Sequence, residues 1–392
     1  MKVGIVQNRI IYGGRLTVIV GIVEVLNRRG IVPDLITFQT TISPNGVYRQ
    51  YGTQINFKIR RINSVLSNIP GEANILAINL AMRRICKQYD YFISSNNTTF
   101  SMPSQIPILS YIHFPRIARL KSPYVSIHFP NGPLKQWRNR QSAIARFMGI
   151  LYSFHRIKNN HYIIANSKFS RLYFQHYFPA YRQHIPVIYP PVKKSKDFLS
   201  PFNKRANLVC SIGRFCQEKN QLGQIGIAER LPDWKFILIG FAGEQNTYLK
   251  ECETYVNEKG IKNVEFEVNV PETRKRELLE AAKFFIHPNI NEPFGISTAE
   301  SILNGCLPLV HNSGGQREIV PFADLRFDAL SDIPRMFKKF SKCDNHLSRL
   351  QKQLIDHCRE RFDFQVFKEK MDTQINHFES VNGLSLVRSQ IR

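Results

Sequence analysis

The stretch Asn291–Val320, NEPFGISTAESILNGCLPLVHNSGGQREIV, contains two glutamates eight positions apart, Glu292 and Glu300. A proline, a glycine and small residues between them predict a loop that turns into a helix, with apolar spacing continuing to residue 303. The apolar run 307–310 then predicts a short buried strand. A helix followed at once by a buried strand is typical of an α/β domain.

This local geometry suits a ligand that carries both phosphate and hydroxyl groups. A helix N-terminus offers unpaired amides and a partial positive charge, which favour a phosphate. We expect Glu292 in the loop before that terminus and Glu300 about two turns inside the helix. Carboxylates accept hydrogen bonds from hydroxyls. The pattern therefore suggests a nucleotide-sugar, although glutamates at this spacing are also common on solvated helices.

The sequence before this stretch predicts a doubly wound α/β domain. Its first strand is followed by Gly213–Lys219, GRFCQEK, in which Arg214 and Lys219 are five residues apart. At the start of a helix, both cations can reach one diphosphate, the arginine by a fork and the lysine as a point charge. The alternative is a surface turn with two cations. Expected strands cover 207–212, 235–239, 264–267 and 284–287, and expected helices cover 243–259 and 272–282.

The N-terminal half predicts another α/β domain that begins with a strand, a loop with Gly13 and Gly14, and a helix from residue 15. Adjacent glycines let backbone amides approach an anion closely, although two glycines alone are more often an ordinary turn. His113 ends a predicted strand, and the carboxyl end of a parallel strand faces the ligand crevice. Residues 39–75 are expected to be loop-rich, with a turn at 44–46. Further strands are expected at 2–7, 32–38, 91–94 and 108–113, a helix at 73–89, and a strand at 163–166 leading to a helix capped by Ser167.

The domain organisation follows from these patterns and from the length of 392 residues, which suits two domains. We expect an N-terminal domain over 1–192, a polar linker over 193–206 and a C-terminal domain over 207–360. A final helix is expected at about 361–392.

Positive charge is concentrated in the first half of the chain. The net charge is +24, and residues 1–190 contain 24 Lys and Arg residues but only four carboxylates. These are Glu24, Asp34, Glu72 and Asp90. The asymmetry indicates an anionic partner such as nucleic acid, an acidic membrane surface or a pyrophosphate-linked lipid. A generally basic proteome is the alternative. The basic, apolar segment 143–158 fits either a membrane-interface helix or a core helix with snorkelling arginines.

Several classes of protein are disfavoured by the composition. No run of about 18 apolar residues predicts a transmembrane helix, and no signal-peptide pattern is present. Seven scattered cysteines without a C-x-x-C pair are typical of reduced thiols, so we expect a cytoplasmic protein. The sequence contains no Walker loop, zincin helix or zinc-spaced Cys/His set, and we therefore expect no metal. The first glycine-rich loop is not a dinucleotide fingerprint, which disfavours a dinucleotide cofactor.

The string EPFGISTAE and the turn HNSGGQREIV resemble the E-x7-E region of retaining glycosyltransferases of family 4. YIHFP, ANSKFS and VIYPPV are similar to further segments of that family, and the last of them implies a strand at 187–192. The resemblance covers nearly the whole chain and implies the GT-B fold, with two Rossmann-like domains facing across a cleft. It also implies an acceptor-binding N-terminal domain, on which the final helix at about 361–392 packs back, and a donor-binding C-terminal domain.

The resemblance implies roles for individual residues. Glu292 would bind the transferred hexose, Glu300 the donor ribose, and Arg214 and Lys219 the diphosphate. His113 would contact the reacting sugar, and the glycine-rich loop would meet the donor. Backbone amides would cap the hexose and phosphate. The resulting site is catalytic at Glu292, His113, Arg214 and Lys219, with donor binding also at Gly13, Gly14, Phe294, Gly295, Ile296 and Glu300.

The resemblance is greatest to mannosyltransferases that extend polyprenyl-diphosphate-linked oligosaccharides. It implies a nucleotide-sugar such as GDP-mannose as co-substrate, no cofactor, and a peripheral position on the cytosolic face of a membrane, with nucleic acid disfavoured as partner. Two departures are the run Ser301–Gly305, which replaces an alanine-rich segment, and Gln316, which stands where proline is common. The alternatives are a soluble sucrose- or glycogen-type glycosyltransferase and a catalytically silent basic module that binds membrane or RNA.

Overall fold

A computed structural model describes residues 1–10, 13–62, 72–97, 105–115, 157, 160–193, 199–340 and 343–384. The chain divides into two compact units, which are described separately here. The first unit consists of residues 1–191 together with 364–392, and the second of residues 192–363. The segment 143–158, with its two alternative interpretations, lies almost entirely outside the described residues.

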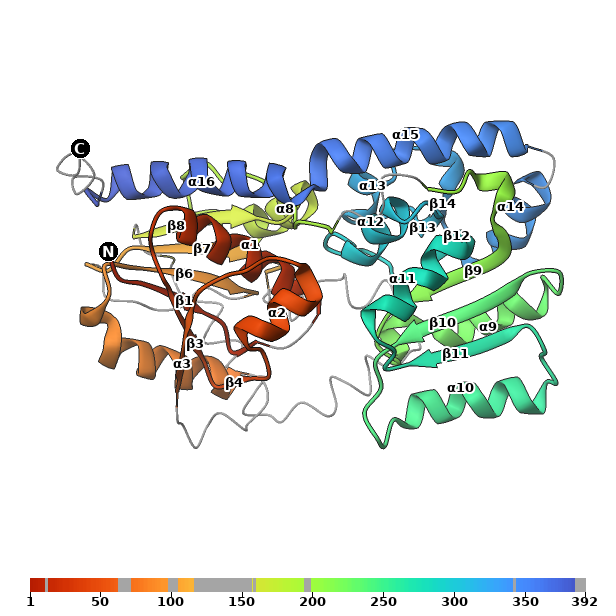
Figure 1. Cartoon of the computed structure of the whole chain (residues 1–392), viewed down its shortest axis with the longest axis horizontal. Coiled ribbons are helices and arrows are strands. Elements are labelled where there is room, and N and C mark those ends of the chain that lie inside the picture. Colours follow the sequence, from red (N-terminus) through yellow and green to blue (C-terminus); the bar gives the residue numbers. More distant parts are fainter. Residues whose placement is uncertain are drawn as a thin grey trace. The chain divides into compact units, whose positions relative to one another are not determined.

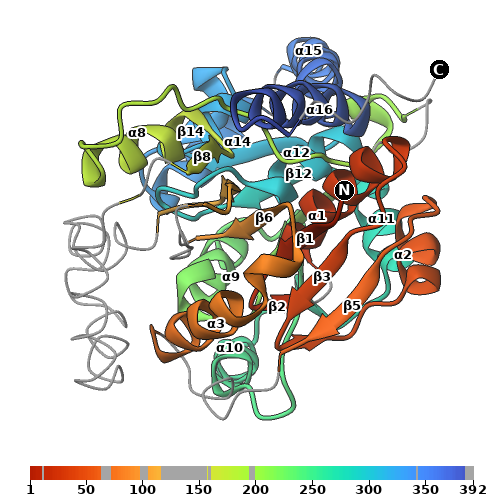
Figure 2. The same cartoon turned by 90° about the vertical axis from the view of Figure 1, so that its left-hand side faces the viewer.

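The first unit is built on a six-stranded parallel sheet with strand order β5-β3-β1-β6-β7-β8 (Figure 1). Strand β1 is the buried apolar run VGIV, and it pairs with β3 on one side and β6 on the other. Figure 2 shows β3 and β5 side by side at one edge of this sheet. The strands are β5 (Lys58–Arg61), β3 (Asp34–Thr37), β1 (Val3–Val6), β6 (Tyr91–Asn96), β7 (Ile108–Ile112) and β8 (His161–Ala165), and the helices are α1 (Gly14–Arg28), α2 (Pro44–Tyr51), α3 (Glu72–Ile85), α8 (Lys168–Tyr177) and α16 (Phe364–Val381).

Helix α1 is apolar on nearly all its faces because it is covered on both sides. Its buried residues share one core with the strands and with four residues of the C-terminal helix α16, Phe367, Met371, Ile375 and Phe378. A Cβ added to Gly21 would lie 2.6 Å from the ring of Phe367, so this glycine sets the closest approach of the two helices. A helix that is apolar all round must be buried, and α16 supplies the second cover. The C-terminal helix therefore belongs to the first unit.

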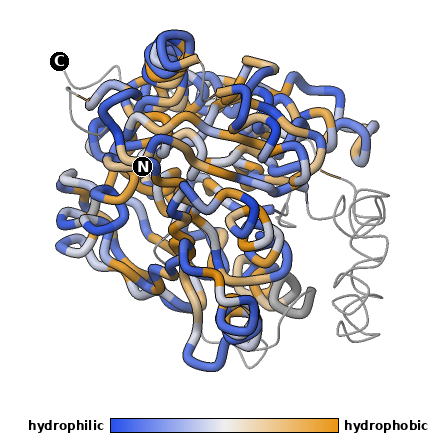
Figure 3. The backbone as a smooth tube through the Cα atoms, turned by 90° about the vertical axis from the view of Figure 1, so that its right-hand side faces the viewer, coloured by the Kyte–Doolittle hydropathy of each residue, from blue (hydrophilic) through white to orange (hydrophobic). Residues whose placement is uncertain are grey.

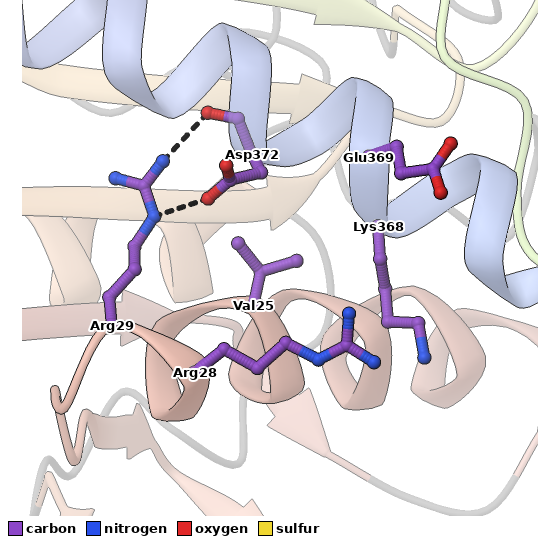
Figure 4. Close-up of a pocket in the computed structure, with 6 residues that line it drawn as sticks. All are labelled: Val25, Arg28, Arg29, Lys368, Glu369 and Asp372. Carbon is purple, nitrogen blue, oxygen red and sulfur yellow. Dashed lines mark hydrogen bonds and ion pairs between the residues drawn. The ribbon is translucent and has the colours of Figure 1, made fainter.

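Charged side chains line the seam between α1 and α16. A pocket of about 450 Å³ lies there, lined by Val25, Arg28, Arg29, Lys368, Glu369 and Asp372 (Figure 4). Arg29 pairs with Asp372 at 2.5 Å and with Glu379 at 3.0 Å. Lys368 and Arg28 both pair with Glu24, at 2.6 and 3.3 Å. These charges neutralise one another, so the seam holds α16 in place.

The second unit contains another six-stranded parallel sheet, with order β11-β10-β9-β12-β13-β14. In Figure 3, where the backbone tube is coloured by hydropathy, hydrophobic segments run through the interior of the fold and hydrophilic segments dominate the outer turns. The strands are β11 (Val264–Val268), β10 (Lys235–Gly240), β9 (Ala206–Ile212), β12 (Ala282–His287), β13 (Leu307–His311) and β14 (Arg326–Phe327), and the helices are α9 (Gln221–Glu229), α10 (Thr247–Glu258), α11 (Glu272–Ala281), α12 (Ile296–Leu303), α13 (Gln316–Ile319), α14 (Ile333–Phe340) and α15 (Asp344–Phe362). The predicted α/β class with two doubly wound sheets is confirmed.

Two local predictions differ from the structure. Residues 44–46 begin helix α2 and are not a turn, because Ser43 caps the helix and Pro44 occupies its first position. Residues 187–192 form only isolated bridges at Val187 and Val192 and no sheet strand. The two intervening prolines, at positions 190 and 191, have no N–H to donate to a ladder.

The expected linker over 193–206 is partly packed within the second unit. Arg205 is buried and donates hydrogen bonds to the carbonyls of Leu279, Ala282 and Asn304. Phe202 is also buried. Only residues 194–198 of the expected linker lie outside the described part of the chain.

None of the helices in the described ranges is long and apolar enough to cross a membrane.

Candidate functional site

Two neighbouring strands of the second unit bring Lys219 and Glu292 together. Lys219 follows β9 and Glu292 follows β12, and these strands are paired in parallel. The carboxyl ends of parallel strands meet at the same edge of a sheet. The Nζ atom of Lys219 lies 3.2 Å from Oε2 of Glu292, and the two side chains are only 18% and 22% exposed. The ammonium and the carboxylate thus form a mostly buried pair at this edge.

Glu292 has two further hydrogen-bonding neighbours on the same oxygen. Nδ2 of Asn289 donates to Oε2 at 2.9 Å, and Nε2 of His287 lies 3.4 Å from it. Burial alone raises the pKa of Glu292, but the Lys219 ammonium and His287 outweigh burial and hold the pKa well below its ordinary value. Burial also lowers the pKa of His287. At neutral pH the site therefore holds a charged carboxylate beside a neutral imidazole.

The loop that carries Lys219 is fixed by its neighbours. A Cβ added to Gly213 would lie 3.0 Å from Cγ of Lys219, so the lysine stem packs directly over this glycine. Side-chain amides of Gln221 and Gln224 in α9 donate to the carbonyls of Arg214 and Lys219, both at 3.0 Å. The Arg214 side chain itself is 69% exposed and lies 3.9 Å from Glu218. The structure therefore places Lys219, but not Arg214, against Glu292.

The Ser-Gly-Gly turn is packed against the backbone of the Glu292 loop. A Cβ on Gly314 would lie 2.5 Å from the carbonyl oxygen of Glu292, and Gly314 has a φ of +67°. The amide of Gly315 donates to that same carbonyl at 2.8 Å. Oγ of Ser313 accepts from the amide of Asn291 at 2.7 Å. Only residues without a side chain allow this approach, and the turn thereby fixes the position of Glu292.

Helix α12 begins directly after this loop, with Gly295 as N-cap at a φ of +107°. Phe294 is buried and packs edge-on against Phe362, and Ile296 is the first helical residue. First-turn amides of a helix have no intrahelical partner and favour an anion. Gln316 is fully buried with its carboxamide beside Gly295, and neither carboxamide atom has a hydrogen-bond partner among the described residues. This helix end can hold a phosphate close to Lys219 and Glu292.

Glu300 is the fifth residue of α12 and so lies about one turn inside the helix, not two as expected. Its Oε1 accepts from Nζ of Lys275 at 2.6 Å, and the same ammonium lies 2.7 Å from Oε1 of Glu272. Burial raises the pKa of Glu300, Lys275 opposes this, and Glu272 adds to it, so that the pKa remains raised. Burial lowers the pKa of Lys275, but the two carboxylates outweigh burial and raise it.

The remaining predicted residues lie in the first unit. His113 follows β7, is buried, and its Nε2 lies 3.0 Å from Oγ of Ser95. Burial, with a smaller effect of Arg15, lowers the pKa of His113 well below its ordinary value, so the ring is neutral. Gly13 is the N-cap of α1 at a φ of +143°, and Gly14 is the first residue of that helix. His113 thus lies at the carboxyl end of β7, and the two glycines lie at the N-terminus of α1.

Sequence reasoning missed the neighbours that hold the glutamates. His287 ends a buried strand five residues before Glu292, and this strand-end position is a signal that was available. Asn289 lies two residues further on. Lys275 lies on a charged, half-exposed helix, and nothing in its local sequence indicates that it reaches Glu300. Within the described ranges, no group of three or more His, Cys, Asp and Glu side chains is placed to hold a metal ion.

Comparisons with known proteins find similarity to glycosyltransferases. Residues 192–324 match the model of the family Glycosyl transferases group 1. The chain is similar to GDP-Man:Man(3)GlcNAc(2)-PP-Dol alpha-1,2-mannosyltransferase of Homo sapiens, with 29% identity over 147 residues. That match covers 33% of this chain and 30% of the human protein, so the chain spans about a third of the length of this relative.

Solved structures resemble the whole chain at low identity. Sucrose-phosphate synthase from Thermosynechococcus elongatus has a TM-score of 0.72 at 13% identity, over 97% of this chain and all of that one. HepE of Anabaena in complex with UDP-glucose has a TM-score of 0.65 at 15% identity, over 96% of this chain and all of that one. The chain therefore has the GT-B fold, resembles Glycosyl transferases group 1 over residues 192–324 and is a distant homologue of dolichol-linked alpha-1,2-mannosyltransferases.

Proposed function

We propose that this chain is a retaining glycosyltransferase that transfers a hexose, preferentially mannose, from a nucleotide-sugar to a lipid-linked glycan. The observation that carries the proposal is the buried pair of Lys219 and Glu292 beside the N-terminus of α12. An ammonium and a helix N-terminus suit a diphosphate, and a fixed carboxylate beside them suits sugar hydroxyls. The similar proteins support this choice, since one relative is a mannosyltransferase that uses GDP-Man and one structural neighbour binds UDP-glucose.

The second unit would hold the donor. In this proposal, Lys219 and the first turn of α12 stabilise the negative charge that develops on the leaving diphosphate. Glu292 accepts hydroxyls of the transferred hexose, and Glu300 accepts those of the ribose. Amides of Phe294, Gly295 and Ile296 cap the hexose and phosphate. Arg214 is exposed and long enough to fold onto a bound diphosphate, where its planar fork would add two hydrogen bonds.

The first unit would take the acceptor. His113 is neutral and can accept or donate one hydrogen bond to a sugar hydroxyl, while Gly13 and Gly14 present backbone at a helix N-terminus. The charge surplus of residues 1–190 supports an anionic acceptor such as a polyprenyl diphosphate and a peripheral site on the cytosolic face of a membrane. A soluble sucrose- or glycogen-type activity leaves this charge unexplained, and a silent binding module leaves the Lys219–Glu292 pair unexplained.

Retention of configuration is proposed to occur on the front face of the sugar. The bond between C1 and the phosphate oxygen breaks, the acceptor oxygen bonds to C1 on the same face, and the acceptor proton passes to the leaving phosphate. A double displacement would instead need a carboxylate nucleophile. In the first unit, Asp34 begins β3 and accepts from Tyr89, and Asp90 precedes β6 and accepts from the amide of Lys2. Both lie at the amino ends of strands, away from His113, and Glu24 is paired in the seam with α16.

The mechanism predicts that none of the four acids of residues 1–190 is a nucleophile. Each is replaced separately by its amide, as Glu24→Gln, Asp34→Asn, Glu72→Gln and Asp90→Asn, and transfer is measured at saturating donor. We expect turnover to remain within about tenfold of the parent in every case. Front-face transfer would be refuted, and double displacement supported, by two results together. One folded variant would have to lose turnover, and a peptide of the parent that contains the same acid would have to carry the sugar covalently.

The function is tested by a panel of GDP-mannose, UDP-glucose and UDP-N-acetylglucosamine with the full chain in a chelating buffer. Donor binding and donor hydrolysis are measured for the parent, Glu292→Ala and the control Glu265→Ala, which removes a surface carboxylate of the same unit. Turnover of one donor, lost in Glu292→Ala and kept in the control, supports the proposal. Absence of binding to every donor, with salt-sensitive binding to anionic vesicles or RNA, would favour the silent module.

A further inference from the structure

A second buried charge cluster lies beside Glu300, and the proposed reaction does not yet use it. Lys275 and Glu272 come from the first turn of α11, and Glu300 comes from α12. One ammonium is shared by two carboxylates, at 2.6 Å from Glu300 and 2.7 Å from Glu272. The Lys275 and Glu300 side chains are 18% and 19% exposed, whereas Glu272 is 33% exposed. This cluster is therefore unlike the surface ion pairs of the same unit, such as Lys235–Glu265, which is 57% and 41% exposed.

The charges around Glu300 make the lysine necessary for its ionisation. Burial and Glu272 both raise the pKa of Glu300, and Lys275 is the close group that opposes them. Lys193 also acts on this cluster, where burial and Arg276 lower the pKa of Lys193 while Glu272 and Glu300 raise it. A buried carboxylate next to a second carboxylate protonates more readily when its counter-ion is removed. A protonated Glu300 would keep one acceptor oxygen fewer for a ligand.

The hydrogen bonds of Glu300 leave part of the carboxylate for a ligand. Oε1 accepts from Lys275 and the Glu272 carboxyl lies within hydrogen-bonding reach of the same carboxylate, and its remaining lone pairs can accept from a ligand. A ribose presents two neighbouring hydroxyls, both of which can donate to a carboxylate. A carboxylate held by an ion pair on one oxygen is oriented in advance for such a ligand, which lowers the cost of binding.

We propose that Lys275 is a positioning residue for nucleotide binding, which keeps Glu300 charged and oriented by sharing its ammonium between Glu272 and Glu300. The inference rests on the proposed function and assigns to that site a residue outside the resemblance. The ligand group concerned is the ribose of a nucleoside diphosphate. Because the ribose is remote from the bond that breaks, the lysine acts on donor binding rather than on the chemical step.

The pH dependence follows from the sign of the interaction. The ammonium of Lys275 lowers the pKa of Glu300, so its removal raises that pKa further above the ordinary value. The acidic limb of nucleotide affinity then moves to higher pH. Lys275→Arg keeps the positive charge and should return the acidic limb of nucleotide affinity to its parent pH, whereas Lys275→Met keeps only the apolar part of the side chain.

The test measures the affinity for GDP and UDP by calorimetry between pH 5 and 8, and KM and kcat for the donor that the parent uses. Lys275→Met, Lys275→Arg and the surface control Lys235→Met are compared with the parent. We expect Lys275→Met to weaken nucleotide affinity and raise the donor KM by tenfold or more at pH 6, with kcat within threefold. The acidic limb should move upward, Lys275→Arg should recover most of the affinity, and the control should match the parent.

Two results would overturn the inference, and they differ from failure of the proposed function. One is unchanged nucleotide affinity in Lys275→Met at every pH. The other is an equal loss in kcat and affinity that is independent of pH and not recovered by arginine, which would indicate a merely structural lysine. A parent that binds neither nucleotide and turns over no donor removes the proposed function, and this inference with it.

Discussion

Replacement of Lys219 by methionine separates electrostatics from packing in the proposed site. The lysine stem packs over Gly213, with Cγ 3.0 Å from the position of an added Cβ, and methionine keeps an unbranched stem of similar length. The substitution therefore removes the ammonium that lies 3.2 Å from Glu292 and leaves most of the packing. Any large effect must come from the lost charge.

The expected loss of activity follows from the role of the ammonium. Removal of one group that stabilises developing negative charge typically costs a factor of about 100–1,000 in kcat, or about 3–4 kcal/mol. We expect Lys219→Met to lose turnover by this factor. The donor KM should change much less, because the charge on the leaving diphosphate grows most in the transition state.

The same substitution leaves Glu292 without its counter-ion in a mostly buried position. An unsatisfied buried polar group costs about 1–3 kcal/mol, and more when it is charged. For a unit of this size, each kcal/mol lowers the melting temperature by roughly 2–4 °C. We expect Lys219→Met to melt about 4–8 °C below the parent. The double variant Lys219→Met with Glu292→Gln removes the buried charge and should recover part of this stability without recovering turnover.

Donor turnover at saturating nucleotide-sugar and thermal melting of all three proteins check the reasoning. Loss of stability without loss of turnover in Lys219→Met would refute the assignment of Lys219 to the leaving group and make it a structural partner of Glu292. Loss of turnover that the double variant recovers would also contradict it.

Three further outcomes follow from the structure. Because Lys219 depresses the pKa of Glu292, the stability of this pair is fully present above the unfolded pKa of about 4.3 and is lost as pH falls through the lower folded pKa. The melting difference between Lys219→Met and the parent should therefore begin to narrow below about pH 4.3 and continue to close as pH falls further. Gly314→Ala places a Cβ 2.5 Å from the Glu292 carbonyl at a φ of +67° and should lose at least about 100-fold in donor turnover. The control Gly226→Ala lies in a helix, meets no atom within 4 Å and should stabilise the protein by about 0.5–1 kcal/mol. Equal donor turnover in the two variants would contradict the role of the turn. Gly21→Val would bring a side chain against a ring of α16 and should destabilise the first unit by about 1–3 kcal/mol, measured by denaturant unfolding, and an unchanged midpoint would show that α16 does not depend on this contact.

Local patterns predicted most elements of the fold because each depends on neighbours in the sequence. The helix after β8 was predicted from Ser167, whose Oγ accepts from the amide of Ser170 at 3.0 Å. The buried strands were recognised as short apolar runs, which parallel sheets covered on both faces require. Helix α2 is not predicted, although Ser43 and Pro44 form a helix start, because Pro-Asn-Gly at 44–46 is also typical of a turn.

The candidate site was predicted only in part. The sequence indicated Glu292, Glu300 and Lys219, and it also indicated that a helix N-terminus lies between the glutamates. It could not assign partners, since Lys219 and Glu292 are 73 positions apart and meet through the pairing of β9 with β12. Arg214 had the same local signal as Lys219, yet its side chain lies at the surface with Glu218.

By itself, the sequence determined the α/β class, the alternation of strands and helices, and the loop that carries Glu292, because periodicity, caps and glycines act over a few residues. Only the tertiary structure decided that α16 covers α1, that Lys219 rather than Arg214 pairs with Glu292, and that Lys275 reaches Glu300. The physical reason is that strand order and helix packing bring distant residues together. The burial that this creates then decides which charges are paired and which pKa values shift.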